Sequence, residues 1–330
     1  MSHLIDMSNG RENMAFVGET PWHGLGQQLD AGTSLDKWRV EAGLDWEIEK
    51  RPVFHGVIDA DGNKKAQTIE NRVALVRSDT QACLSIMSNS RYKVVQPGEI
   101  IEFYRDLVDS SDFELETAGS LKNGSKIWAL ARGANALRIS GTDVIKPYLL
   151  LATACDGSMS TVAQFTSVRV VCNNTLSLSV GSNGGKADIR VPHSRDFSAD
   201  AVKKELGLVD ERLATFSNDV DRLAAEKISD ETAIKFFIGL YAKTDSSGAV
   251  TNEKNLEKIT ADLINAYRNG PGADLVSARG TVWGAVNAVT NYQDFTARAR
   301  SNENRFNAGQ FGAGAAIKAK AFDTALQLVA

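Results

Sequence analysis

Cysteine, histidine and long apolar runs are all scarce in this 330-residue sequence. The cysteines are odd in number and scattered, which favours free thiols in a reducing compartment over a disulfide framework. They are Cys83, Cys155 and Cys172. No CxxC pair occurs and the four histidines lie far apart, so the ligands of a structural zinc site are not grouped. No apolar run approaches the ~20 residues that cross a bilayer, and the N-terminal segment lacks the basic start and apolar stretch of a secretory signal. We therefore expect a cytoplasmic protein with no membrane association, no metal and no cofactor.

Sequence motifs of common enzymes are missing as well. The segments GVIDADGNKKAQT and GSNGGKAD place lysine near glycine but lack the GxxxxGK[ST] spacing of a phosphate-binding loop. There is no GxSxG nucleophile motif. Asp156 in ACDGS fits a turn better than an acid–base carboxylate, because Asp-Gly pairs favour turns. We expect no catalytic residue and no enzymatic activity, with an enzyme of small molecules or nucleotides built on His23 and Asp156 as an alternative.

Charge is distributed unevenly along the chain, although the whole sequence has a net charge of only −4. Residues 1–117 carry net −8, residues 118–195 net +6, residues 196–267 net −5 and residues 268–320 net +4. A protein that is acidic overall can still present a basic groove, because a nucleic acid responds to the local field. The two basic blocks either form such a surface or lie on unrelated parts of the molecule.

The sequence patterns divide the chain into three parts. These are an N-terminal ordered loop and helix (1–45), an antiparallel α+β core (46–195) and a helical region (196–330). The elements expected in the first two parts are a helix at 33–43, strands at 46–57, 72–78 and 82–88, a helix crossing the sheet at 99–109, and hairpins at 122–124 and 156–158. The last part is expected to hold one long helix after residue 196 and further helices near 230–243, 253–268, 281–300 and 314–329. The predicted fold class is α+β, an antiparallel β-meander sheet with a crossing helix, followed by a helical C-terminal region.

Residues 167–180, SVRVVCNNTLSLSV, combine an apolar strand pattern with buried-looking polar residues. We interpret SVRVV as the closing strand of the meander, after which Asn173 or Asn174 caps a helix that begins at Thr175. No comparable structural role explains Arg169. Alternation places it on the face of the strand opposite to Val168 and Val170. It either pairs with a carboxylate or lies on the open face of the sheet.

The strand KIWALARG predicts a surface suited to nucleic acid. Alternation places Lys126, Trp128 and Arg132 on one face, where cations meet phosphates and the indole stacks on a base. Alternatively, Trp128 belongs to the core and the two cations extend past it to solvent. Further candidate contacts to nucleic acid are Arg138, Lys146, Arg169, Asn173, Asn174, Arg298, Arg300 and Arg305. The last three end a predicted helix, where cations also simply complement the helix dipole.

Three aromatic or imidazole side chains are possible ligand contacts outside that strand. Trp22 and His23 lie in the loop ETPWHGLG, where they either contact a ligand or fix the loop to the core. Tyr92 is a second candidate for base stacking.

Four segments together resemble a known family. They are SNGRENMAFVGETPWHGLG, YKVVQPGEIIEF, TACDGS followed by VRVVCNNTLSLS, and WGAVNAVTNY. In combination they resemble the phage/plasmid-like family called domain of unknown function 932, from about Met7 to the C-terminus. This resemblance implies a mobile-element context and no particular enzymatic activity. The order of strands and helix is also broadly similar to the core of single-strand annealing proteins, which implies rings or filaments that hold single-stranded DNA in a basic groove.

The sequence therefore predicts single-stranded DNA binding and annealing in phage or plasmid recombination, by a homo-oligomer that forms a ring or filament. The alternative from another class is a protein-binding factor of a mobile element, for example in counter-defence, that uses the acidic residues of segment 1–117.

Overall fold

The computed structural model describes residues 5–18, 25–110, 113–134, 136–139, 143–169, 174–177, 188–206, 209–301, 304–305, 308–309 and 312–330. Its fold is mixed α+β, with antiparallel sheets and a helical C-terminal region, which confirms the predicted class. Among the described residues, no helix is both long and apolar enough to cross a membrane.

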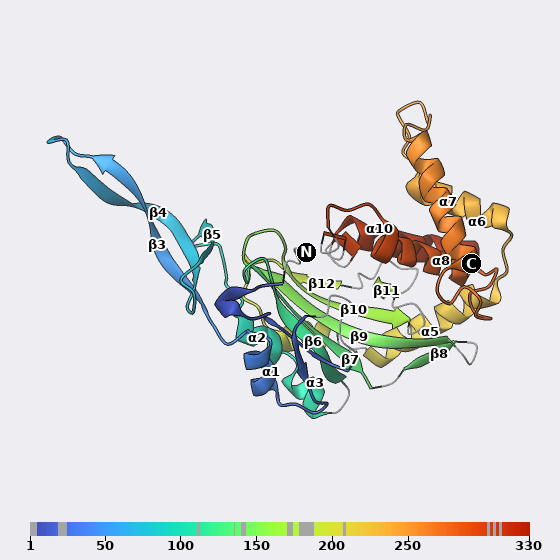
Figure 1. Cartoon of the computed structure of the whole chain (residues 1–330), viewed down its shortest axis with the longest axis horizontal. Coiled ribbons are helices and arrows are strands. Elements are labelled where there is room, and N and C mark those ends of the chain that lie inside the picture. Colours follow the sequence, from blue (N-terminus) through green and yellow to red (C-terminus); the bar gives the residue numbers. More distant parts are fainter. Residues whose placement is uncertain are drawn as a thin grey trace.

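A nine-stranded sheet forms the centre of the molecule (Figure 1). Its main path runs β11-β10-β9-β7-β6-β1-β2, with β12 beside β10 and β8 beside β9. The strands are β1 (Met14–Val17), β2 (Gln27–Leu29), β6 (Phe113–Leu121), β7 (Lys126–Gly133), β8 (Leu137–Ile139), β9 (Asp143–Ala154), β10 (Thr161–Arg169), β11 (Asn174–Ser177) and β12 (Asp188–Val191). All pairs are antiparallel except β1 with β2.

Both predicted hairpins of the meander are present. Lys122, Asn123 and Gly124 have φ values of 52°, 56° and 91°, the left-handed conformation that Asn-Gly turns accept, and they join β6 to β7. At the second turn, Gly157 has φ 76° and the backbone N–H of Ser158 donates to the Asp156 carboxylate at 2.9 Å. That bond supports the interpretation of Asp156 as a turn residue.

Three short helices lie on one side of the sheet (Figure 1): α1 (Leu35–Glu41), α2 (Pro97–Glu102) and α3 (Arg105–Asp109). The single crossing helix predicted at 99–109 is thus two helices, with Phe103 and Tyr104 between them. Tyr104 is fully buried, and its hydroxyl lies 2.8 Å from the carbonyl oxygen of Ala129 and 2.9 Å from that of Leu149. This hydroxyl fixes the helices to the middle of the sheet.

The C-terminal part is helical, as predicted. It contains α4 (Ala199–Leu206), α5 (Val209–Ala225), α6 (Asp230–Tyr241), α7 (Glu253–Asn269), α8 (Val282–Asn291), a π-helical turn (Tyr292–Thr296) and α10 (Ala313–Leu328). Helix α8 consists of small and apolar residues and is buried along most of its length, so the other helices pack around it. One continuous apolar core joins these helices to the sheet, and the proposed division into three parts stays a prediction.

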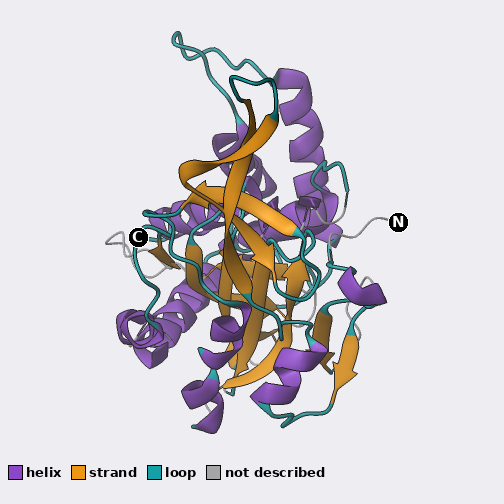
Figure 2. Ribbon diagram, turned by 90° about the vertical axis from the view of Figure 1, so that its left-hand side faces the viewer, coloured by secondary structure: helices purple, strands orange, loops and turns teal. Residues whose placement is uncertain are grey.

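A second sheet projects from the body of the molecule (Figures 1 and 2). It contains β3 (Ile48–Ile58), β4 (Lys64–Arg77) and β5 (Cys83–Ser88) in that spatial order. Strand β5 pairs only with residues 72–76 of β4, so among the described residues the outer part of the arm has two strands. We call residues 54–58 and 64–68, which pair with each other, the distal ribbon.

Three expectations about local structure are wrong. Asn174–Ser177 is a strand that pairs with β10, not the start of a capped helix, because TLSLS alternates polar and apolar residues as a strand does. The helix expected to reach residue 300 ends at Thr296, since Ala297 has an extended ψ of 135°. Arg298, Arg300 and Arg305 therefore lie beyond that helix rather than at its end. The single helix expected at 99–109 is two helices, α2 and α3. The long helix predicted after residue 196 covers α4 and α5, and the two residues between them lie outside the described ones.

Candidate functional site at the projecting ribbon

The predicted alternation along β7 is confirmed, but its basic face is largely neutralised. Lys126, Trp128 and Arg132 are half-buried on one face, while Ile127, Ala129 and Ala131 are fully buried on the other. The guanidinium of Arg132 lies 2.8 Å from Glu114 Oε2 and 3.4 Å from Glu116 Oε2. Two carboxylates thus surround the one arginine, and this arrangement disfavours a phosphate there.

Trp128 joins a small apolar cluster rather than an open stacking surface. It packs with Leu25 against the buried side chains of Ile5, Met14 and Leu121. Burial lowers the pKa of the neighbouring Lys126. These contacts favour the alternative in which Trp128 belongs to the core and Lys126 extends past it.

Tyr92 is not available to stack on a base, so that expectation is wrong. Only 8% of the residue is exposed, its hydroxyl donates to the carbonyl oxygen of Ala154 at 3.1 Å, and its ring stacks on His193 with centroids 4.6 Å apart. Burial raises the pKa of its phenol well above the ordinary value. Tyr92 is a structural anchor.

The other predicted contacts are dispersed. Arg138 is exposed on β8 and Lys146 is half-buried on β9. Arg298 and Arg300 are exposed, whereas Arg305 donates from Nε to the carbonyl oxygen of Ala297 at 2.8 Å. Trp22, His23 and Asn173, together with the side chains of Arg169 and Asn174, lie outside the described residues. The backbone register pairs Arg169 with Ile145 of β9.

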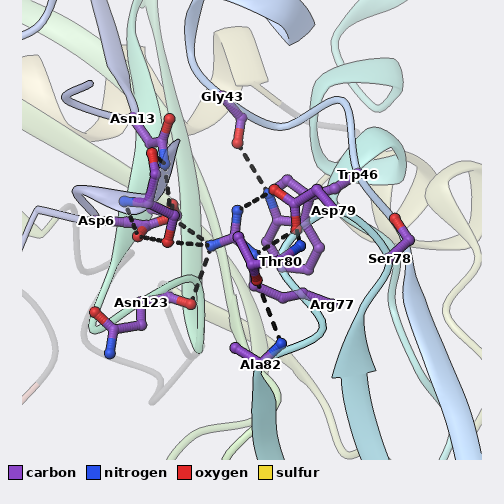
Figure 3. Close-up of polar contacts among 12 residues, drawn as sticks. Asp6, Asn13, Gly43, Trp46, Arg77, Ser78, Asp79, Thr80, Ala82 and Asn123 are labelled. Carbon is purple, nitrogen blue, oxygen red and sulfur yellow. Dashed lines mark hydrogen bonds and ion pairs between the residues drawn. The ribbon is translucent and has the colours of Figure 1, made fainter. Parts of the chain in front are cut away.

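A buried arginine clamp holds the arm to the body of the molecule (Figure 3). Arg77, at the end of β4, is 1% exposed, and Asp6 beside it is 0% exposed. The Arg77 guanidinium pairs with Asp6, donates to both carboxylate oxygens of Asp79 at 2.9 and 2.7 Å, and donates to the carbonyl oxygen of Asn123 at 3.0 Å. Its flat face lies 4.1 Å from the ring centroid of Trp46. The clamp therefore joins the N-terminal segment, the arm and the β6–β7 turn.

The electrostatics of the clamp favour the ionised forms of both partners. Burial by itself would raise the pKa of Asp6, but hydrogen bonds from Ser8 and Arg77 outweigh it, so the pKa lies below its ordinary value. Asn13 adds a further hydrogen bond to the same carboxylate at 2.8 Å. A buried charge is tolerated only when it is paired and hydrogen-bonded in this way. The clamp thus ties the base of the arm to the body of the molecule.

The distal ribbon presents an aromatic and a cation to solvent. Phe54 is 55% exposed and Ile58 is 73% exposed. The register places Lys64 opposite Ile58, so all three side chains share one face. The Lys64 ammonium forms no ion pair or hydrogen bond with another described residue. Exposed large apolar side chains in a row indicate a binding surface.

Small residues keep that face flat between its two apolar side chains. Gly56 lies between Phe54 and Ile58 on β3, opposite Ala66 on β4. A Cβ atom added at Gly56 would meet no atom within 4 Å, so the surface beside the Phe54 ring is open. A planar group can therefore lie against the ribbon next to this ring.

These features define a mixed α+β protein with a core sheet that is mostly antiparallel and a projecting β arm whose base is held by Arg77. The family model described as "Domain of unknown function (DUF932)" matches residues 84–309, about two thirds of the chain, and the chain belongs to that family. Neither the comparison with curated proteins nor the comparison with solved structures finds a match. The match begins at β5, so the distal ribbon and Arg77 precede it.

Sequence reasoning placed a strand in each of β3, β4 and β5, but it missed the hairpin through which β3 and β4 project from the molecule, although one signal for it was present. Residues 56–68 place glycines near lysines, as a phosphate-binding loop does, yet they form the tip of a hairpin. Asp59 accepts from the backbone N–H groups of Asp61 and Asn63 at 3.0 and 2.8 Å, and Gly62 has φ 81°. An Asp-Gly pair between two alternating segments is a hairpin signal. This signal would have extended the first predicted strand to Ile58 and would have started the second at Lys64.

Proposed function

We propose that the protein binds single-stranded DNA and promotes its annealing as a homo-oligomer, in the cytoplasm of a bacterium whose phage or plasmid encodes it. The observation that carries the proposal is the open face of the distal ribbon, with its exposed Phe54 ring and unpaired Lys64. This surface takes the place of the β7 face, where Arg132 is neutralised.

The chemistry of this face suits an unpaired strand. An exposed aromatic ring accepts a base by stacking, which contributes ~1–3 kcal/mol per base, and it does so with little preference for sequence. Duplex DNA hides its base faces, so Phe54 favours single strands. Lys64 adds one phosphate contact on the same face. The open backbone surface at Gly56 gives the base room beside the ring.

Binding of a fluorescent single-stranded oligonucleotide tests the proposal. Phe54→Ala is expected to weaken binding about 5- to 100-fold, the equivalent of ~1–3 kcal/mol of lost stacking. Lys64→Ala is expected to reduce the slope of log affinity against log salt concentration by about 0.7, because one fewer phosphate is neutralised. Val276→Ala is the matched control, since Val276 is 64% exposed in the C-terminal part. Unchanged binding in both ribbon variants would refute this site.

A second function, binding of another protein, is favoured by Ile58, which is 73% exposed and has no role in stacking. A pull-down from nuclease-treated host lysate separates the two functions, because partners attached through DNA are lost. A protein retained by the natural chain and lost with Ile58→Asp, while oligonucleotide binding persists, would favour the second function.

A further inference from the structure

A polar pocket lies at the base of the arm, where β4 meets the turn that follows β5. It is lined by Glu70, Asn71, Arg72, Ser88, Ser90 and Arg91, and its volume is about 560 Å³. We call it the arginine pocket. It adjoins neither the buried clamp residue Arg77 nor the face of the distal ribbon.

Asn71 builds the first wall of this pocket. It has φ 55°, a left-handed conformation that asparagine tolerates, at an irregularity in the pairing of β3 with β4. Its side-chain oxygen accepts from the backbone N–H of Ser90 at 3.0 Å and from the hydroxyl of Ser88 at 3.4 Å. The backbone N–H of Asn89 donates to the Asn71 carbonyl oxygen at 3.1 Å. The turn after β5 is thus fixed against β4.

Lys50 and Tyr92 secure the opposite wall. The Lys50 ammonium donates to the carbonyl oxygen of Tyr92 at 2.8 Å and to that of Asn89 at 3.4 Å. The backbone N–H of Tyr92 donates to the Ser88 carbonyl oxygen at 3.0 Å, and the Tyr92 ring is buried. Arg91 therefore projects from a backbone that is anchored immediately after it.

The two arginines of the pocket lack the carboxylate partners that several other arginines of this chain have. Arg51, Arg105, Arg132 and Arg268 each pair with at least one carboxylate. The guanidinium groups of Arg72 and Arg91 form no ion pair and no hydrogen bond with any described residue. Glu70 is the one carboxylate that lines the pocket, so its side chains carry a formal charge of +1.

We propose that the arginine pocket binds a phosphate group. Two guanidinium groups on one cavity repel each other, and an oxyanion between them removes that repulsion while it receives charge-assisted hydrogen bonds. The register places Arg72 directly opposite Ser88, so the Ser88 hydroxyl, whose proton is directed to Asn71, lies beside one of the guanidiniums. Ser90 adds a second hydroxyl from the fixed turn. This site is separate from the distal ribbon and does not rest on the proposed function.

Calorimetric titration of the full chain with pyrophosphate and with inorganic phosphate tests the site. Saturable binding is expected, and Arg72→Gln and Arg91→Gln are each expected to weaken it roughly 10-fold or more, because each removes charged hydrogen bonds. Glu70→Gln is expected to tighten it severalfold, because a like charge leaves the pocket. That gain cannot result from misfolding. Arg300→Gln, an exposed arginine of the C-terminal part, is the matched control.

Oligonucleotides with and without a 5′-phosphate identify the source of the phosphate. If arginine-dependent binding requires the 5′-phosphate, the pocket binds a terminal phosphate. If arginine-dependent binding does not require it, the pocket binds a phosphate of the DNA backbone. Arginine-dependent binding of pyrophosphate alone assigns a free phosphate compound. All three results support the site. Failure of every probe to bind the natural chain, or equal binding by both arginine variants and the natural chain, would overturn it.

Discussion

Replacement of Arg77 by methionine tests how the arm is held. Methionine retains much of the side-chain volume but removes the charge, leaving the fully buried Asp6 carboxylate without its cation and Asp79 without its two guanidinium hydrogen bonds. Removal of one partner from a buried ion pair typically costs ~3–5 kcal/mol. The lower half of that range is expected, because Ser8, Asn13 and Ser120 still donate to Asp6.

Urea unfolding measures this cost, with Arg51→Met as the control. Arg51 pairs with Glu49 on the surface, where the two side chains are 45% and 42% exposed, and such a pair contributes only ~0–1 kcal/mol. We expect Arg77→Met to lower the free energy of unfolding by ~3–4 kcal/mol and Arg51→Met by less than ~1 kcal/mol. Equal losses in the two variants would refute the reasoning that Arg77 is a buried clamp.

Two further changes act on the same clamp. Because the folded-state pKa of Asp6 lies below the unfolded value, its stabilisation is present above about pH 4 and is lost as the pH falls through the folded pKa. The difference in unfolding free energy between the natural chain and Asp6→Asn should therefore be constant from neutral pH to about pH 5 and shrink below about pH 4. A difference that grows as the pH falls would contradict a lowered pKa of Asp6 in the folded state. Gly124 and Gly62 both have a positive φ, 91° and 81° respectively, so alanine is strained at either position. At Gly124 the added Cβ would also lie 2.6 Å from Arg77 Nη1 and 2.8 Å from the Trp46 ring, whereas at Gly62 it would meet nothing within 4 Å. In thermal unfolding, Gly124→Ala should lower the unfolding free energy by ~1–3 kcal/mol more than Gly62→Ala does. Equal losses in the two variants would count against tight packing of Arg77 and Trp46 around Gly124.

Local sequence patterns predicted much of the fold because they depend on neighbouring residues alone. The alternation in KIWALARG gave the faces of β7, and Asn123-Gly124 gave the turn before it. Ser34 and Gly43 mark the limits of the first helix, where Ser34 accepts from the backbone N–H of Lys37 and Gly43 has φ 64°.

The candidate site depended on pairings that no local pattern contains. Arg132 meets Glu114 because β6 lies beside β7 in one particular register, and that register decides whether the arginine is free or neutralised. Phe54 looks like a core residue in sequence, because an aromatic in an alternating strand is usually buried. It is exposed because β3 and β4 extend beyond β5. Tyr92 shows the reverse, since its burial results from contacts with distant Ala154 and His193.

The most direct test of the central claim is the affinity for a fluorescent single-stranded oligonucleotide, measured over a range of salt concentrations for the natural chain and for Phe54→Ala. The account predicts an affinity that falls with salt for both proteins, with the Phe54→Ala curve displaced to weaker binding by about 5- to 100-fold throughout. Coincident curves for the two proteins, or no binding by the natural chain even at low salt, would contradict the claim that the distal ribbon binds single-stranded DNA.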